Sequence, residues 1–124
     1  MIDNLKKDNM NNLRNKVQLI GHLGMNPEVR TTVSGRKLAR LQVATTESYK
    51  NGKGEWIKNT QWHNVTAWGK TAEMAEANLH KGAEVQVEGK LVHREYIDKT
   101  GVKKYITEVQ ATELQAIPKV SKAQ

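Results

Sequence analysis

Residues 60–91 read TQWHNVTAWGKTAEMAEANLHKGAEVQVEGKL, and this stretch decides the fold. In its first part, residues 60–68, apolar Val65 and Ala67 alternate with a mostly polar set that contains Trp62 and Trp68. Alternation with a period of two predicts a strand with one buried face. The two tryptophans therefore belong to the face away from the core, roughly 20 Å apart along the strand.

A short helix is predicted after this strand. Thr71 is the predicted N-cap, and Ala72, Ala75 and Leu79 recur at helical spacing. Lys81-Gly82 supplies a basic residue and a glycine, which is typical of a helix C-terminus. The chain therefore changes from strand to helix and back within about 30 residues.

Further strand patterns lie on both sides of this stretch. Residues 16–24 have apolar residues at steps of two or four, with Gly21 and Gly24 as predicted bulge or bend points. A turn at Ser34-Gly35 joins a short segment, 28–33, to a long strand, 37–48, and residues 49–59 are predicted as a flexible basic hairpin loop. The remaining predicted strands cover residues 85–91 and 104–115, with a turn at 98–101 between them.

The order of these elements predicts the fold class. Five strands with one short helix between the third and the fourth are typical of an oligonucleotide/oligosaccharide-binding (OB) barrel. We therefore predict an all-β protein with one short helix, built as a five-stranded OB barrel. From the pattern alone, the alternative is an unrelated small β-barrel that carries one helix.

Length and composition limit the organisation of the chain. Its 124 residues carry a formal net charge of +7, 37% apolar residues and no cysteine, which leaves room for one domain without disulfides or thiolate metal sites. We predict a flexible arm over residues 1–15, a folded domain over 16–117 and a short disordered end over 118–124. No secretory signal or membrane span is recognisable, so we expect a cytoplasmic, nucleoid-associated protein without membrane contact.

Signatures of catalysis are missing from the sequence. Trp68-Gly69-Lys70-Thr71 is similar to the end of a phosphate-binding loop, but Asn64 stands where that motif requires glycine. The four histidines have neither helical pair spacing nor a metal-site pattern. We therefore expect no enzymatic activity, no metal and no cofactor.

Aromatic and basic residues share the faces that point away from the core. Trp62 and Trp68 lie on the polar side of their strand, and the outer set of the next strand runs from Lys90 through Arg94 to Tyr96. Aromatic faces stack on any base and cations neutralise phosphates, whereas a duplex hides its base faces. The pattern predicts binding of single-stranded nucleic acid. The alternative for each tryptophan is packing against a neighbouring strand or subunit.

At these residues the sequence resembles the bacterial single-stranded DNA-binding protein family. The resemblance covers about residues 15–115 and rests on several spaced motifs. They are Gly21-His22-Leu23-Gly24, Pro27-Glu28-Val29-Arg30, Ala44-Thr45-Thr46-Glu47-Ser48-Tyr49, Trp62-His63-Asn64-Val65, Trp68-Gly69-Lys70 and Lys81-Gly82 through Val87-Glu88-Gly89. It implies an OB fold, assembly as a homotetramer, and sequence-independent binding of single-stranded DNA in replication, recombination and repair.

The resemblance also implies a set of binding residues. Four family positions that stack on bases fall on Tyr49, Trp62, Trp68 and Tyr96, and Trp56 is a candidate fifth contact. The family positions expected to contact phosphates are Lys16, Lys50, Lys70, Lys81 and Arg94. Lys53 of the basic loop and Lys90 of the outer strand set are further expected phosphate contacts. His63 matches a position at the subunit contact, and a buried histidine with satisfied hydrogen bonds is the alternative there.

The chain differs from typical family members at its end. Residues 119–124, KVSKAQ, stand where those members continue into a Gly/Pro/Gln-rich linker and an acidic tip that recruits other proteins. Recruitment of replication or repair enzymes through such a tail is therefore not expected. Two other functions remain open from the residues: an adaptor that mainly binds a replication protein, and a binder of single-stranded RNA.

Overall fold

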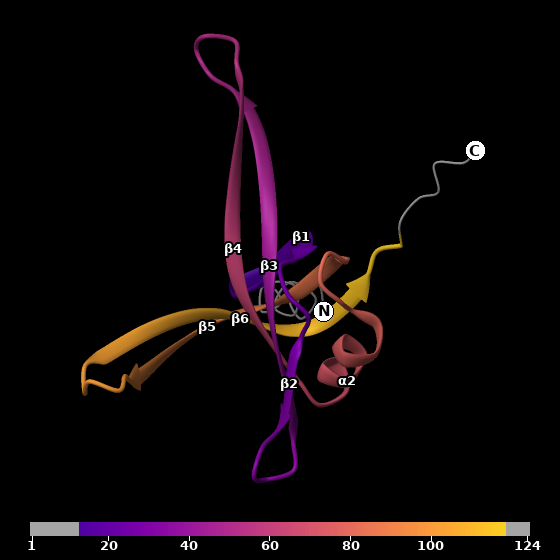
Figure 1. The fold of residues 1–124 in the computed structure, drawn as a ribbon, viewed down its shortest axis with the longest axis vertical. Coiled ribbons are helices and arrows are strands. Elements are labelled where there is room, and N and C mark those ends of the chain that lie inside the picture. Colours follow the sequence, from indigo (N-terminus) through magenta and orange to yellow (C-terminus); the bar gives the residue numbers. More distant parts are fainter. Residues whose placement is uncertain (1–12, 119–124) are drawn as a thin grey trace, which may run out of the picture.

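The computed structural model describes residues 13–118, which include six strands and the helix α2. In chain order these are β1 (Val17–Leu23), β2 (Glu28–Thr31), β3 (Lys37–Lys50), β4 (Trp56–Trp68), α2 (Gly69–Asn78), β5 (Glu84–Ile97) and β6 (Lys103–Ala116) (Figure 1). No helix within residues 13–118 is long and apolar enough to cross a membrane.

Five of the strands close into a barrel. β1 pairs with β5 and then, through His22 and Leu23, with β3. β5 pairs with β6, β6 lies parallel to β4 at Val65↔Val109, and β4 returns to β3. β2 pairs with β3, outside this ring. Because α2 lies between the third and the fourth barrel strand, the predicted OB barrel with one short helix is confirmed.

The barrel interior is filled by small and branched apolar side chains. On β4, Val65 and Ala67 are buried, as their alternation predicts, and they pair with the buried residues Leu41 and Ala39 of β3. The helix adds its predicted apolar positions to the same core, and these close one end of the barrel. They are Ala72, Ala75 and Leu79.

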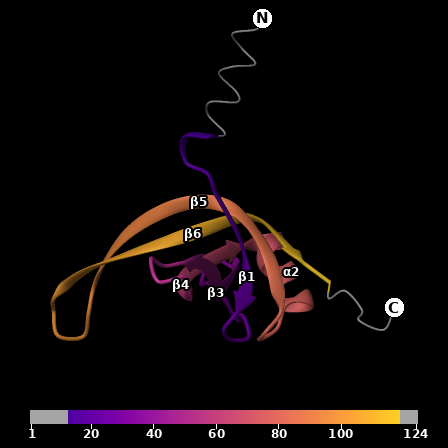
Figure 2. The same cartoon turned by 90° about the horizontal axis from the view of Figure 1, so that it is seen from above.

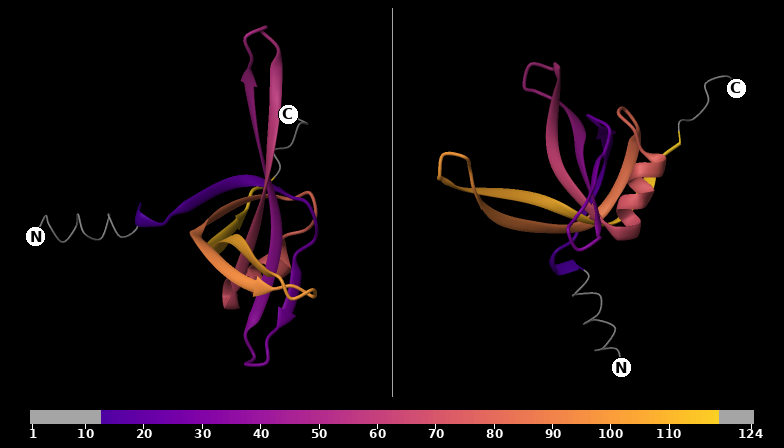
Figure 3. Two further views of the ribbon diagram at one scale, coloured as in Figure 1. Left: turned by 90° about the vertical axis from the view of Figure 1, so that its left-hand side faces the viewer. Right: turned by 60° about the horizontal axis from the view of Figure 1, so that its bottom comes forward.

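Three hairpins extend from the barrel as arms (Figures 1 and 3). One of them is the β3–β4 arm, which contains the hairpin predicted over residues 49–59, but the loop is shorter than predicted and covers only residues 51–55. Pairing continues out to Lys50↔Trp56, and the turn between them is held by Asn51, whose side-chain oxygen accepts the N–H groups of Lys53 and Glu55. Both faces of this arm are outside the core, so the residues there lack the apolar alternation that reveals a strand.

The helix begins and ends earlier than predicted. Thr71 is inside α2, and Trp68 is the N-cap, in an extended conformation and without a side-chain cap. Gly69 has φ +59°, a left-handed conformation that lets the chain turn into the helix directly after the strand. The predicted stop at Lys81-Gly82 was also wrong, because α2 ends at Asn78. Gly82 instead forms a turn and donates its N–H to the Leu23 carbonyl at 2.9 Å.

Gly21 and Gly89 lie where the backbone of a neighbouring strand leaves no room for a side chain. β5 is strongly curved (Figure 2), and the irregularity in its pairing with β6 lies between Glu88 and Gly89. Gly21, a predicted bulge, is instead paired regularly with Val85, and a Cβ there would lie 2.9 Å from the Ala44 carbonyl carbon. β1 therefore passes against β3 at Gly21 as it changes partner.

The predicted chain ends fall mostly outside the described residues. This applies to residues 1–12 of the predicted arm and to 119–124 of the predicted C-terminal segment. Asn15, the last residue of that arm, accepts the Leu91 N–H at 2.9 Å and donates to the Leu91 carbonyl at 3.0 Å. The chain is thus attached to β5 just before β1 begins.

Candidate nucleic-acid interface

One continuous outer face covers four strands of the barrel. Pairing sets Trp68 opposite Leu38, Trp62 opposite Ala44, and Thr66 opposite Gln110. From β6 the same face continues to β5, where the paired positions on this side carry Lys90, Val92, Arg94 and Tyr96. We call this even-numbered side of β3, β4, β5 and β6 the outer face. It brings together most of the predicted stacking and phosphate-binding residues.

Trp62 lies on this face with its ring against a glycine. The side chain is 60% exposed. A Cβ at Gly24 would lie 2.7 Å from Cη2 of the indole and closer still to Cζ3, so the ring rests directly on the glycine backbone. One part of the indole is thereby supported while the rest is open to solvent. This is the arrangement that a platform for a base requires.

Trp68 is half-buried and has a cation beside it. The guanidinium carbon of Arg36 lies 4.6 Å from the centroid of the ring. Trp68 also lines a hollow of about 200 Å³, whose other walls come from β3, β4, β5 and β6. Those walls carry Leu38, Arg40, Thr66, Val92, Arg94, Glu108 and Gln110. A second hollow of about 160 Å³ shares Arg40, Thr66 and Glu108 with the first.

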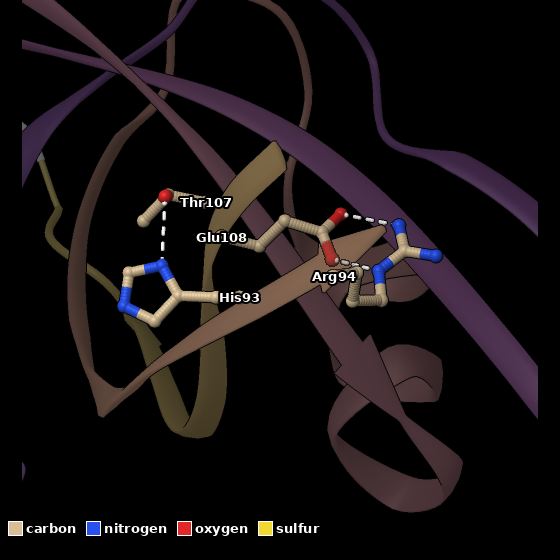
Figure 4. A network of polar contacts seen from close by, with 4 residues as sticks. All are labelled: His93, Arg94, Thr107 and Glu108. Atoms are coloured by element: carbon tan, nitrogen blue, oxygen red, sulfur yellow. Dashed lines mark hydrogen bonds and ion pairs between the residues drawn. The ribbon is translucent and has the colours of Figure 1, made fainter. Parts of the chain in front are cut away.

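A buried carboxylate forms the floor of these hollows. Glu108 is 6% exposed and accepts two hydrogen bonds from Arg94, from Nε at 2.6 Å and from a terminal nitrogen at 3.0 Å (Figure 4). This hydrogen bond, supported by the charge of Glu108, raises the pKa of Arg94 above its ordinary value. Much of the positive charge of Arg94 is therefore offset by Glu108. On the opposite side of the hairpin, His93 and Thr107 form a separate hydrogen bond at 2.9 Å.

The β3–β4 arm extends the aromatic stripe. Trp56 is 68% exposed and lies at the even-numbered side of β4, with Nζ of Lys50 5.5 Å from its ring centroid. Tyr49 is exposed as well, but it pairs with Ile57 and so projects from the opposite side of the arm. The structure therefore brings Trp56 and Lys50 into line with Trp62 and Trp68 and leaves Tyr49 apart.

The β5–β6 arm carries the fourth predicted platform. Tyr96 lies on the outer face opposite Lys104, and 45% of its surface is exposed. Tyr105, which the sequence did not single out, is more exposed, but it pairs with Glu95 and belongs to the other side of this arm. Lys104 lies 3.7 Å from Asp98, so its charge is partly offset.

The remaining predicted lysines lie at separate places. Lys16 lies 3.8 Å from Glu88 before β1, and Lys53 is exposed at the tip of the β3–β4 arm. Lys70 lines a shallow depression between α2 and the end of β6, which shares no lining residue with the two hollows described above. Lys81 is exposed in the turn after α2, where its backbone N–H donates to Asn26.

His63 lies on the core side of β4 near the mouth of the barrel. It is half-buried, opposite Val43, and its Nε2 lies 2.9 Å from the Thr45 hydroxyl. This hydrogen bond satisfies one ring nitrogen within the chain. A role at a subunit contact stays a prediction.

Three residues of this region were missed from the sequence: Arg36, Arg40 and Glu108. Strand pairing between distant segments brings Arg40 and Glu108 to the outer face, and the turn before β3 brings Arg36 to Trp68. No local motif reports these contacts. Arg36, Leu38 and Arg40 alternate along the chain, and Leu38 pairs with Trp68. This alternation could have indicated that both arginines lie on the same side as Trp68.

The chemistry of the outer face is that of binding. Within residues 13–118 no three His, Cys, Asp or Glu side chains are grouped so that they could hold a metal ion. Every buried side-chain polar atom of the described residues has a hydrogen-bond partner. The face offers aromatic surfaces and cations to a ligand.

Known proteins of similar sequence and structure are single-stranded DNA-binding proteins. Single-stranded DNA-binding protein 1 of Chlorobaculum tepidum is 45% identical over 104 residues, which are 83% of this chain and 64% of that protein. A structure of Plasmodium falciparum SSB in complex with ssDNA superposes with a TM-score of 0.77 at 27% identity and covers 84% of this chain and 95% of that one.

A deletion mutant of the single-stranded DNA binding protein from Thermus aquaticus gives a TM-score of 0.74 at 32% identity, over 84% of this chain and 50% of that one. This chain thus spans less than two thirds of the Chlorobaculum and Thermus chains. The family model described as single-strand binding protein family matches residues 14–117. The resemblance seen in the sequence is confirmed, and the chain belongs to the single-strand binding protein family.

Proposed function

We propose that the protein binds single-stranded DNA without sequence preference by stacking bases on its outer face. The observation that carries this proposal is the row of three tryptophans on β4, each exposed in part and each beside a neighbour from another segment. Gly24 lies under Trp62, Arg36 beside Trp68 and Lys50 beside Trp56. Stacking contributes about 1–3 kcal/mol per base and tolerates any base, whereas duplex DNA hides the base faces.

Phosphate neutralisation supplies the second part of the binding energy. The chain carries a net charge of +7. Lys50 is exposed beside Trp56, Lys53 is exposed at the tip of the same arm, and Lys90 is exposed on β5. Contacts to phosphates release counterions, so affinity falls as salt rises. Arg94 contributes less than a free arginine, because Glu108 holds its guanidinium and offsets its charge.

The assembly in this proposal is a homotetramer that serves replication, recombination and repair in the cytoplasm. His63 is the proposed subunit-contact residue, since it is half-buried yet lines a hollow with Trp62 and Leu91 that opens to the surface. Sedimentation equilibrium of the wild type and of His63→Lys tests this part. A tetramer that dissociates in the variant supports it, and a monomeric wild type contradicts it.

The experiment for the binding function is a competition. A fluorescently labelled oligo(dT) is bound to the protein and displaced by unlabelled oligo(dT), by duplex DNA and by poly(U), at low and at high salt. We expect oligo(dT) to compete at least tenfold better than duplex at both salts. Equal competition by duplex would overturn the proposal, and stronger competition by poly(U) would favour RNA as the ligand.

A matched pair of variants tests the stacking itself. Trp62→Ala removes an aromatic from the outer face, whereas Tyr105→Ala removes an even more exposed aromatic from the other side of the β5–β6 arm. We expect Trp62→Ala to weaken oligo(dT) binding at least fivefold and Tyr105→Ala to leave it within twofold. Equal effects would mean that exposure alone, and not the outer face, determines binding.

A further inference from the structure

Arg36 is held in place beside Trp68 by the turn that joins β2 to β3. The Arg36 carbonyl accepts the Thr32 N–H at 2.8 Å, and the Arg36 N–H donates to the Thr32 hydroxyl at 3.2 Å. Gly35, with φ +88°, donates its N–H to the Thr32 carbonyl and closes the turn. The backbone of Arg36 is thus fixed, and its side chain reaches the end of β4.

The guanidinium of Arg36 lies over the indole of Trp68. Its carbon is 4.6 Å from the Trp68 centroid, which is cation–π distance. Among residues 13–118 no carboxylate lies within ion-pair distance of Arg36, in contrast to Arg94 and Lys37, which are paired with Glu108 and Glu76. Arg36 therefore keeps its full charge while it contacts the ring.

The hollow beside Trp68 is left open by this contact. Trp68 lines the hollow of about 200 Å³ and Arg36 does not. The guanidinium lies over the ring and does not line the hollow. A planar cation on one side of the indole and a base on the other are compatible.

We propose that Arg36 is a positioning residue for the Trp68 platform. It holds the indole against the hollow, so that a base stacks on the open side, and its N–H groups remain available to the neighbouring phosphate. This inference rests on the proposed function, because it assigns Arg36 to the same single-stranded DNA site. It makes the turn at residues 32–36 part of the binding surface.

The test compares Arg36→Ala with Arg30→Ala. Arg30 is exposed on β2 of the same hairpin, so both variants lose one positive charge near the same place. Salt screens a charge that acts through Coulomb attraction alone, but it does not restore the position of a ring. At low salt both variants bind a short oligo(dT) more weakly than wild type. At high salt we expect Arg30→Ala to match wild type within 1.5-fold and Arg36→Ala to remain about 2- to 5-fold weaker.

Two further measurements separate the possible failures. In a Trp56→Phe/Trp62→Phe background Trp68 is the sole tryptophan, and Arg36→Ala should change its emission in the absence of DNA. In a Trp68→Ala background, Arg36→Ala and Arg30→Ala should have equal effects. If Arg36→Ala and Arg30→Ala bind oligo(dT) with equal affinity at high salt in the wild-type background, the role of Arg36 is refuted. If Trp68→Ala and Trp62→Ala both bind as wild type, the proposed stacking function itself fails.

Discussion

A methyl group added at Gly24 tests the Trp62 platform without changing the indole itself or the charge of the protein. The Cβ of Gly24→Ala would lie 2.7 Å from Cη2 of Trp62, whereas ordinary contact begins near 3.4 Å. Gly24 has no left-handed φ, so alanine is compatible with the backbone there. Because most of the ring is exposed, the indole can yield, and we expect it to move by about 1 Å.

The size of the effect follows from the surface involved. Trp62 is 60% exposed, so on the order of 100 Å² of its surface is covered, worth about 2.5 kcal/mol if all of it were lost. A shift of the ring keeps most of that contact, and we expect the free energy of unfolding to fall by about 0.5–1 kcal/mol. Stacking is worth about 1–3 kcal/mol per base, so losing half of it at this position weakens oligo(dT) binding about 2- to 13-fold.

The assay is oligo(dT) binding, with urea unfolding as the stability readout. Gly52→Ala is the matched control, because a Cβ there meets nothing within 4 Å and its φ is not left-handed. In a Trp62→Ala background, Gly24→Ala should have no further effect on binding. Wild-type binding by Gly24→Ala, or an equal loss in the Trp62→Ala background, would refute the reasoning that Gly24 acts through this ring.

Two further predictions concern the β5–β6 hairpin. Arg94→Leu leaves the buried Glu108 carboxylate without its donors and should lower the free energy of unfolding by about 2 kcal/mol. The loss is smaller than for a fully buried pair because Arg94 is half-exposed. Adding Glu108→Gln should recover at least half of this loss, and a double variant less stable than Arg94→Leu would contradict the prediction. Hydrogen bonds from the Thr100 hydroxyl and the Val102 N–H lower the pKa of Asp98 below its ordinary 3.8. Protection of the Val102 amide against hydrogen exchange, corrected for the intrinsic rate, should therefore hold above pH 3.8 and be lost as pH falls through the lowered pKa, whereas Asp98→Asn should abolish this dependence.

The barrel and the side on which the tryptophans lie follow from local alternation. Val65 and Ala67 are buried because strands with one buried face must alternate, and this placed Trp62 and Trp68 on the other side before any contact was known. The same reasoning found the helix and its three apolar positions. It failed at the helix start, because Gly69 allows a turn directly after the strand and no side-chain cap is needed.

The arms and the supports of the rings could not be predicted in this way. In the β3–β4 arm both sides are exposed, so burial imposes no pattern on residues 49–59, and backbone pairing alone continues the strands. Gly24 under Trp62 and Arg36 beside Trp68 are contacts between segments more than 30 residues apart. They depend on how the barrel closes, which no local spacing encodes.

The central claim is that bases stack on the tryptophans of the outer face. The most direct test uses a Trp56→Phe/Trp68→Phe variant, in which Trp62 is the sole tryptophan, titrated with poly(dT) and with duplex DNA while binding is followed independently by anisotropy. We predict strong, saturable quenching of Trp62 by poly(dT) and none by duplex. Binding of poly(dT) without any change in Trp62 fluorescence would contradict the account.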